Sequence, residues 1–223
     1  MGSKSTIMNK VRSSLSVNGG DADRKKAVAK RLNKPPQGII PKRGQLNEDA
    51  RRDLFIEMAE RVQATTDRVN SADDVPTAVA NYLRNHNLEQ IIHVGSDPRV
   101  SAMPWDKAPQ LEVLDDICTR ADSVTLTHAF AGVAESGTAI MTSGPDNPTS
   151  NNFLPQTHIV VLNAPDIKGD YESVWQRLRT VHGKGTMPRT VNMITGPSRS
   201  ADIEQTLILG AHGPRALHVI VVG

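Results

Sequence analysis

Short runs of apolar residues recur from residue 91 to the end of the sequence. Each run has four to six residues, several of them β-branched, and glycine or polar residues follow most of them. Continuous apolar runs of this length are typical of strands buried on both faces, as in a parallel or mixed sheet. The predicted strands are residues 91–95, 124–127, 138–142, 158–162, 191–195 and 217–222.

Apolar residues with helical spacing predict four helices. The first begins after Asn47, a good N-cap that precedes two acidic residues. Its apolar stripe consists of Phe55, Met58, Ala59, Val62 and Val69. The other helices are expected at residues 76–85, 170–181 and about 201–209. The last two separate predicted strands, so the pattern predicts an α/β fold with a mixed, largely parallel sheet and crossover helices.

The composition changes at about residue 45. Residues 1–45 lack a sustained apolar period, and Val11, Leu15 and Val17 indicate only a short helix. The region ends in a stretch with three prolines and two glycines, as a linker does. We therefore expect a basic, flexible arm with a Pro/Gly linker at residues 1–45 and one α/β domain at residues 46–223.

Positive charge is concentrated in this arm. Residues 1–52 carry 13 Lys or Arg and 4 Asp or Glu. Residues 53–223 carry 13 Lys or Arg and 20 Asp or Glu. The arm could contact nucleic acid or an acidic partner, or fold over the acidic body of its own chain. Aromatic residues make up only 3% of the chain and no DNA-reading motif follows the arm, which favours the last alternative over nucleic acid.

Cys118 is the only cysteine. One thiol excludes an internal disulfide, a Cys-based zinc site and an iron–sulfur cluster held by this chain alone. None of the seven histidines forms a tight ligand pair, so we expect no metal and no cofactor. No stretch approaches the roughly 20 apolar residues that span a bilayer. These features predict a cytoplasmic location and no membrane partner.

A carboxylate and a glycine stand at the turn between two β-type runs, in residues 134–138. Glu135 could act as a base, a nucleophile or a cation ligand, and Gly137 would let the backbone approach a ligand closely. The same residues would also suit a simple hairpin turn with an exposed Glu. The pattern leaves both interpretations open.

Hydroxyl groups and one arginine fill the segment between the predicted strand at 191–195 and the helix expected at 201–209. Free N–H groups at the start of that helix would form an anion site, assisted by the Arg199 guanidinium. Alternatively, Ser200, Asp202 and Glu204 cap the helix and Arg199 pairs with one of the carboxylates. Neither GxGxxG nor Walker A spacing is present, so no dinucleotide or P-loop site is predicted.

We expect both turns to line one pocket for a small-molecule anion. Glu135 is the candidate catalytic residue. The candidate anion-binding or substrate-binding residues are Gly137, Thr138, Thr195, Gly196, Ser198, Arg199, Ser200 and His212.

Five segments occur in an order that resembles the LUD domain of the lactate utilization protein C family. They are residues 131–138, 154–161, 194–204, 210–214 and 217–220, and the resemblance covers about residues 90–223. The family often has Thr where this chain has Ser136 and Ser200, and both changes keep the hydroxyl. The resemblance implies an α/β fold related to ribose-phosphate isomerases, CoA-transferases and formyltetrahydrofolate cyclo-ligases.

The resemblance also implies a role in bacterial oxidation of L-lactate to pyruvate. Members of the family act with two partners, an iron–sulfur protein and a cysteine-rich oxidoreductase subunit. CoA-transferases of the wider fold use a Glu near a Gly-containing turn as nucleophile, and Glu135 is its nearest analogue here. The motifs leave open whether the chain is itself catalytic. The alternative is a stand-alone enzyme that binds a carboxylate, a CoA ester, a folate or a phosphorylated metabolite.

Overall fold

The computed structural model describes residues 3–16, 20–118, 123–183, 185–201 and 207–223. The chain divides into two units, Met1–Ile39 and Ile40–Gly223. The first unit contains helices α1 (Ser3–Ser14) and α2 (Ala22–Asn33), and neither helix buries a residue. The Asp21 carboxylate caps α2 by accepting hydrogen bonds from two backbone N–H groups. The sequence pattern indicated a short helix near α1 and missed α2.

A six-stranded sheet forms the centre of the second unit, in the order β1-β12-β7-β4-β2-β3. Every pair of neighbouring strands in it is parallel. Its strands are β1 (Thr65–Val69), β2 (Ile91–His93), β3 (Glu112–Leu114), β4 (Val124–His128), β7 (Thr157–Asn163) and β12 (Ala216–Val222). The central strands β4, β7 and β12 consist mainly of buried β-branched and leucine residues, as expected for a parallel sheet covered on both faces.

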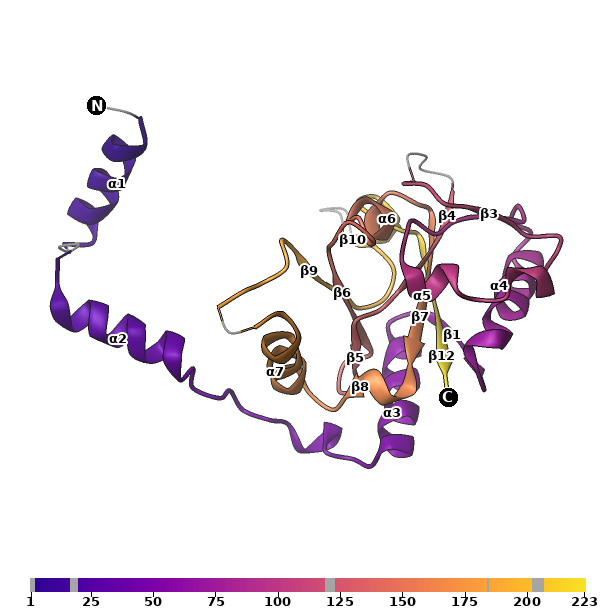
Figure 1. Cartoon of the computed structure of the whole chain (residues 1–223), viewed down its shortest axis with the longest axis horizontal. Coiled ribbons are helices and arrows are strands. Elements are labelled where there is room, and N and C mark those ends of the chain that lie inside the picture. Colours follow the sequence, from indigo (N-terminus) through magenta and orange to yellow (C-terminus); the bar gives the residue numbers. More distant parts are fainter. Residues whose placement is uncertain (1–2, 17–19, 119–122, 184, 202–206) are drawn as a thin grey trace. The chain divides into compact units, whose positions relative to one another are not determined.

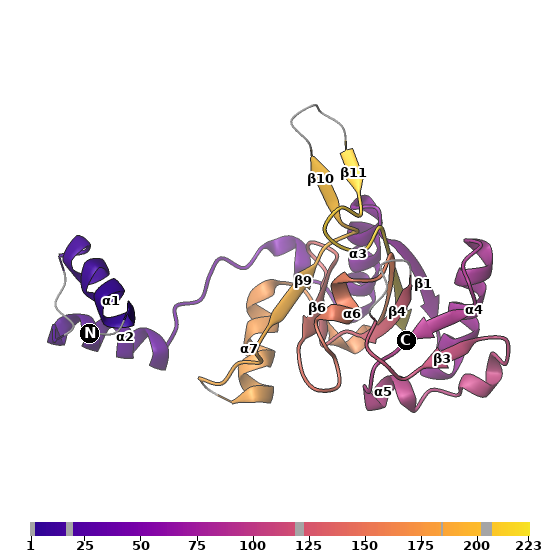
Figure 2. The ribbon, with the colours of Figure 1, turned by 90° about the horizontal axis from the view of Figure 1, so that it is seen from above.

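A second sheet of four strands has the order β8-β5-β6-β9 and is mainly antiparallel. Its strands are β5 (Ala131–Val133), β6 (Thr138–Thr142), β8 (Ile167–Lys168) and β9 (Val191–Ile194). Strands β10 (Arg199–Ala201) and β11 (Leu207–Leu209) form a separate antiparallel pair, visible in Figure 2.

Helices enclose the two sheets. The α-helices of this unit are α3 (Glu48–Arg61), α4 (Val75–Asn85), α5 (Pro98–Ser101), α6 (Ser150–Phe153) and α7 (Tyr171–His182). Short 3-10 turns lie at Lys42–Gly44, Ala72–Asp74, Trp105–Lys107 and Ala164–Asp166. In the described part of the chain, no helix is long and apolar enough to cross a membrane.

Three apolar clusters hold these layers together. Helix α4 packs Val79 and Leu83 on one face of the large sheet. Between the two sheets, α3 contributes Phe55 to the second cluster. Helix α7 covers the outer side of the small sheet, so α4 and α7 lie at opposite sides of the unit with the strands between them (Figure 1). Side chains along a strand alternate between two faces, which places one residue set of β7 against α4 and the other between the sheets.

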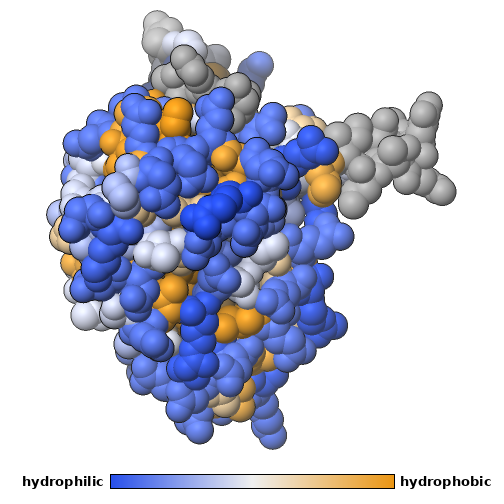
Figure 3. All heavy atoms as spheres, turned by 90° about the vertical axis from the view of Figure 1, so that its right-hand side faces the viewer, coloured by the Kyte–Doolittle hydropathy of each residue, from blue (hydrophilic) through white to orange (hydrophobic). Residues whose placement is uncertain are grey.

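On the side that faces right in Figure 1, hydrophilic residues cover most of the surface (Figure 3). Apolar residues appear there only as small separate patches among them. The apolar strands are therefore covered on this side by the polar outer faces of the surrounding elements.

The α/β fold with a mostly parallel sheet agrees with the prediction from the sequence, and all six predicted strands exist. One strand and one residue lie elsewhere than the sequence pattern predicted. Strand β9 belongs to the small sheet and pairs antiparallel with β6, so it does not lie beside β7 or β12. Val69, which was placed on the first helix, belongs to β1, because α3 ends at Arg61 and the β-branched Thr65 and Thr66 start a strand.

The prediction of a helix at about residues 201–209 is wrong. Both ends of that segment pair with each other as β10 and β11, with Arg199 opposite Leu209. Asp202 and Glu204, the expected capping residues, lie outside the described residues. Arg199–Ala201 and Leu207–Leu209 are therefore extended, and the helix N-terminus of the predicted anion site is not formed at Ser200.

Candidate functional site

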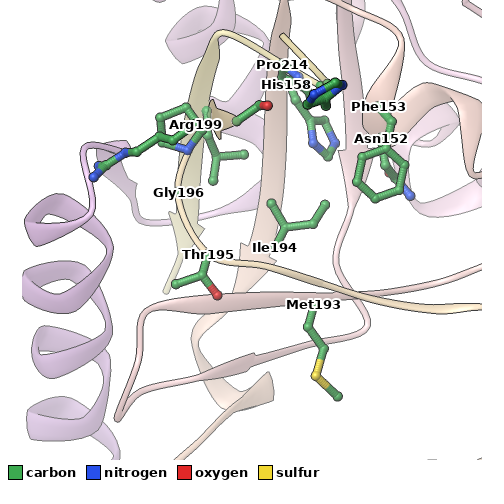
Figure 4. Close-up of a pocket in the computed structure, with 14 residues that line it drawn as sticks. Asn152, Phe153, His158, Met193, Ile194, Thr195, Gly196, Arg199 and Pro214 are labelled. Atoms are coloured by element: carbon green, nitrogen blue, oxygen red, sulfur yellow. The ribbon is translucent and has the colours of Figure 1, made fainter. Parts of the chain in front are cut away.

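A cavity of about 280 Å³ lies at the amino ends of β7 and β12. The segment after β9 and the segment before β12 meet there and cover it (Figure 4). Its apolar lining comprises Phe153, Met193, Ile194, Pro197, Pro214 and Leu217. The rest of the lining consists of two glycines, Gly196 and Gly213, and of the polar side chains of Asn152, His158, Thr195, Ser198, Arg199 and His212. Ligands of open α/β sheets usually bind at the carboxyl ends of the strands. This cavity therefore lies at the opposite edge of the large sheet.

His158 is the most buried polar residue of the cavity, with no exposed surface. It is the second residue of β7 and lies on the strand face that points between the sheets. The Thr127 hydroxyl of β4 lies 2.7 Å from its Nε2, which fixes the ring. Its Nδ1 has no hydrogen-bond partner among the described residues. Burial lowers the pKa of His158 to about 3, so the ring is neutral at physiological pH.

Asn152 of α6 lines the same cavity and is 1% exposed. Both its amide nitrogen and its amide oxygen lack a partner in the described part of the chain. A buried amide without hydrogen bonds destabilises a protein, so such groups normally have a partner that is either protein, water or ligand. Asn152 and His158 together leave three buried polar atoms without a hydrogen-bond partner among the described residues beside the cavity.

The segment Thr195 to Arg199 forms one wall of the cavity. Gly196 has a φ of +75°, and a Cβ there would lie 2.4 Å from the Val62 carbonyl oxygen at the end of α3. The N–H of Ser198 donates to the Pro214 carbonyl over 2.8 Å and is therefore not free to bind an anion. Arg199 donates to the Val62 carbonyl, and Figure 4 shows its side chain extending toward α3 and away from His158.

The Glu135 turn lies beside this wall. The Thr138 and Thr195 hydroxyls are 2.7 Å apart, and the Tyr171 hydroxyl lies 2.9 Å from both Thr138 and Ser136. Gly137 has a φ of +63° and packs so tightly on α3 that a Cβ would lie 2.2 Å from the Ala59 nitrogen. This close approach to α3, and not an approach to a ligand, explains the glycine.

Glu135 itself is 5% exposed and lies beneath Arg43, whose Nε is 3.9 Å from its carboxylate. Its Oε2 accepts no hydrogen bond from the described residues. The turn is therefore not the exposed hairpin that one interpretation of the sequence allowed. The carboxylate is also not part of the cavity lining.

The structure thus brings the two predicted turns together, but only one of them lines the cavity. Thr195, Gly196, Ser198, Arg199 and His212 are lining residues, whereas Glu135, Gly137, Thr138 and Ser200 are not. Sequence reasoning missed Asn152 and His158. The signal for His158 was a histidine inside an otherwise apolar strand, and for Asn152 a pair of asparagines shortly before that strand.

No group of three or more His, Cys, Asp or Glu side chains within the described ranges is arranged to hold a metal ion. Cys118 is buried, and its sulfur lies 2.6 Å from the Ser123 hydroxyl. The side chains that line the cavity accordingly offer hydroxyl, amide, imidazole and guanidinium groups.

Comparison with known proteins identifies the family. Residues 52–222 match the LUD domain, a stretch that includes every residue of the cavity. The chain belongs to the LUD domain family. Lactate utilization protein C of Macrococcus caseolyticus is 30% identical over 72% of this chain and 71% of that protein. Lactate utilization protein C of an Exiguobacterium species is 34% identical over 57% of this chain, and the match spans 59% of that protein's length.

The fold of this LUD domain also occurs in a solved structure. A DUF162 family protein from Deinococcus radiodurans superimposes with a TM-score of 0.55 and 22% sequence identity. The match covers 80% of this chain and 99% of the other. At this identity the similarity establishes the shared fold.

Proposed function

We propose that this LUD domain chain is a component of a bacterial system that oxidises L-lactate to pyruvate. The observation that carries the proposal is the convergence of the family's segments on one cavity. Residues 154–161, 194–204, 210–214 and 217–220 each contribute lining residues. Residues 131–138 join them through the hydrogen bond between Thr138 and Thr195. The names of the relatives support lactate utilization as the process in which the cavity acts.

The redox centre belongs to partner proteins in this proposal. Oxidation of lactate removes two electrons and two protons from C2 and its hydroxyl group, so an electron acceptor is required. The only cysteine of this chain is buried. An iron–sulfur protein and a cysteine-rich oxidoreductase subunit would accept the electrons, and the complex would operate in the cytoplasm.

Reconstitution tests the proposal. The purified chain is combined with the two partner proteins from its own operon, and lactate-dependent reduction of an artificial electron acceptor is followed. We expect turnover only when all three are present, and at least a tenfold lower rate with His158→Gln. The matched control is His182→Gln on α7, outside the cavity, which is expected to retain the wild-type rate. Equal rates with and without this chain would refute the proposal.

A stand-alone enzyme is the second candidate, because the cavity is formed within this single chain. Carboxylates, CoA esters, folates and sugar phosphates are then the ligand classes to screen by thermal shift. A ligand that binds the folded state alone raises the melting temperature with concentration. A large shift with one of these ligands, together with turnover of that ligand by the isolated chain, would favour the second candidate.

A further inference from the structure

Residues 42–46 form a strap across the loop that joins β8 to α7. Gly44 packs so closely on Gly169 of this loop that a Cβ at Gly44 would lie 2.0 Å from the Gly169 carbonyl oxygen. The Gln45 amide donates a hydrogen bond to the Asp170 carboxylate over 2.9 Å. Within the strap only Gly44 is buried. The strap is therefore a surface segment that rests on this loop.

The Glu135 carboxylate lies beneath the strap. Its Oε2 is 3.9 Å from the Arg43 Nε, which is too long for a hydrogen bond. The Glu135 side chain is 7% exposed, whereas the Arg43 side chain that lies over it is 59% exposed. The Glu135 N–H donates to the Gly169 carbonyl, on which Gly44 also packs. The strap thus separates a buried carboxylate from solvent with one loosely paired, exposed arginine.

The hydrogen bonds of the strap allow it to lift as a unit. Its two backbone hydrogen bonds are each 3.0 Å long and join residues inside the strap. Among the described residues, no backbone hydrogen bond joins residues 42–46 to another element. When Gln45 leaves, Asp170 keeps the hydrogen bonds that it accepts from the N–H and the hydroxyl of Ser173. Segments with so few contacts open at a lower free energy than the whole domain unfolds.

We propose that residues 42–46 act as a lid that opens and closes over Glu135 while the α/β domain stays folded. In the closed state the lid shields the carboxylate and holds the Arg43 guanidinium beside it. In the open state the carboxylate is accessible, so a cationic group that binds Glu135 must first displace Arg43. The covered turn is connected to the cavity wall by the hydrogen bond between Thr138 and Thr195. This inference goes beyond the proposed function and does not depend on it.

Chemical labelling of carboxylates tests this inference on the full-length chain at pH 6.5. A carbodiimide couples glycine ethyl ester to accessible carboxyl groups, and peptide mass spectrometry gives the labelling rate of each residue. We expect measurable labelling of Glu135 at a rate at least tenfold below that of the exposed Glu89. Asp97, which is 4% exposed and paired with Arg99, reports on opening of the domain away from the strap.

Three variants separate opening of the lid from unfolding of the domain. Gln45→Ala removes the side-chain hydrogen bond of the lid and should raise the Glu135 rate at least fivefold, with the Asp97 rate unchanged. Gly44→Ala prevents closure and should bring the Glu135 rate close to that of an exposed carboxylate. Val79→Ala is the control, because it destabilises the core under α4 and should leave the Glu135 rate unchanged.

The labelling rates also define the results that overturn the inference. It is overturned if Gln45→Ala leaves the Glu135 rate unchanged, or if Val79→Ala accelerates labelling of Glu135 as much as that of Asp97. It is equally overturned if Glu135 of the wild type reacts as fast as Glu89, or reacts only when the domain unfolds. The lactate oxidation assay does not enter these measurements, so the two proposals are tested separately.

Discussion

At the scale of single residues, two buried histidines make the fold sensitive to acid. Burial lowers the pKa of His158 to about 3 and that of His218 to about 4. The unfolded chain holds both near the usual value of about 6.5. Between these values only the unfolded state takes up the protons, so stability is complete above about pH 6.5 and falls as the pH drops toward 4.

We predict that each of these histidines lowers the free energy of unfolding by about 2 kcal/mol between pH 7 and pH 5. Urea unfolding at the two pH values measures the loss. His218 stacks on Tyr82 with 4.0 Å between ring centroids, so His218→Phe retains the ring contact and removes the proton site. This variant should lose about 2 kcal/mol less than wild type on acidification. An equal loss in both proteins would show that His218 is not held neutral by the fold.

A second prediction at this scale concerns the effect of a substitution at Gly137 on stability. Its φ of +63° is unfavourable for any other residue, and an added Cβ would meet the α3 backbone. Gly137→Ala should lower the free energy of unfolding by about 2–4 kcal/mol, from backbone strain and overpacking together. Gly144→Ala is the control, because the nearest atom to its Cβ is 4.0 Å away. Equal effects of the two substitutions in denaturant unfolding would contradict this account.

At the scale of elements, α3 was predictable because its signals are local. Asn47 accepts a hydrogen bond from the Ala50 N–H over 2.9 Å, as its position in the sequence suggested. Asn47→Ala should lower the free energy of unfolding by about 1 kcal/mol, whereas Asn47→Ser should be nearly neutral. Thermal and urea unfolding of both variants measure the difference. If the two variants are equally destabilised, the cap does not stabilise α3.

The β10–β11 pair was not predictable in the same way. Ser200 and the acidic residues after it form a good helix-capping pattern, but the pairing of β10 with β11 prevails. Strand pairing depends on contacts between residues that are distant in sequence. The secondary-structure propensity of a single segment does not include these contacts. For the same reason the short strands β3, β5 and β8 were missed: each has at most three residues and is stabilised by its neighbours.

The candidate site illustrates the same limit. The loops at 134–138 and 194–200 carry conspicuous polar residues, and the structure places them side by side. Which of these residues line the cavity depends on where α3 lies. Gly137 packs on α3, and Val62, directly after α3, contacts Gly196 and accepts a hydrogen bond from Arg199. Asn152 and His158 were inconspicuous in sequence, since their importance comes from burial without partners.

At the scale of the whole molecule, the boundary between the two units determines which part of the N-terminal region supports the LUD domain. The second unit begins at Ile40, ahead of the boundary expected from composition. Gly44 contacts the Gly169 backbone so closely that neither position has room for a Cβ. The Gln45 amide donates to Asp170 over 2.9 Å, and Arg43 lies over the Glu135 carboxylate. Residues 42–45 thus cover part of the Glu135 turn.

Two truncations test this boundary. Removal of residues 1–39 should leave the melting temperature nearly unchanged, because α1 and α2 bury no residue. Removal of residues 1–46 should lower it by several degrees, since about 1–3 kcal/mol is lost when Asp170 and Glu135 lose their partners and the surface under Gly44 is exposed. Limited proteolysis of the full chain should accordingly cut before residue 40. Equal melting temperatures for the two truncated proteins, or first cuts within residues 90–223, would show that the domain boundary is misplaced.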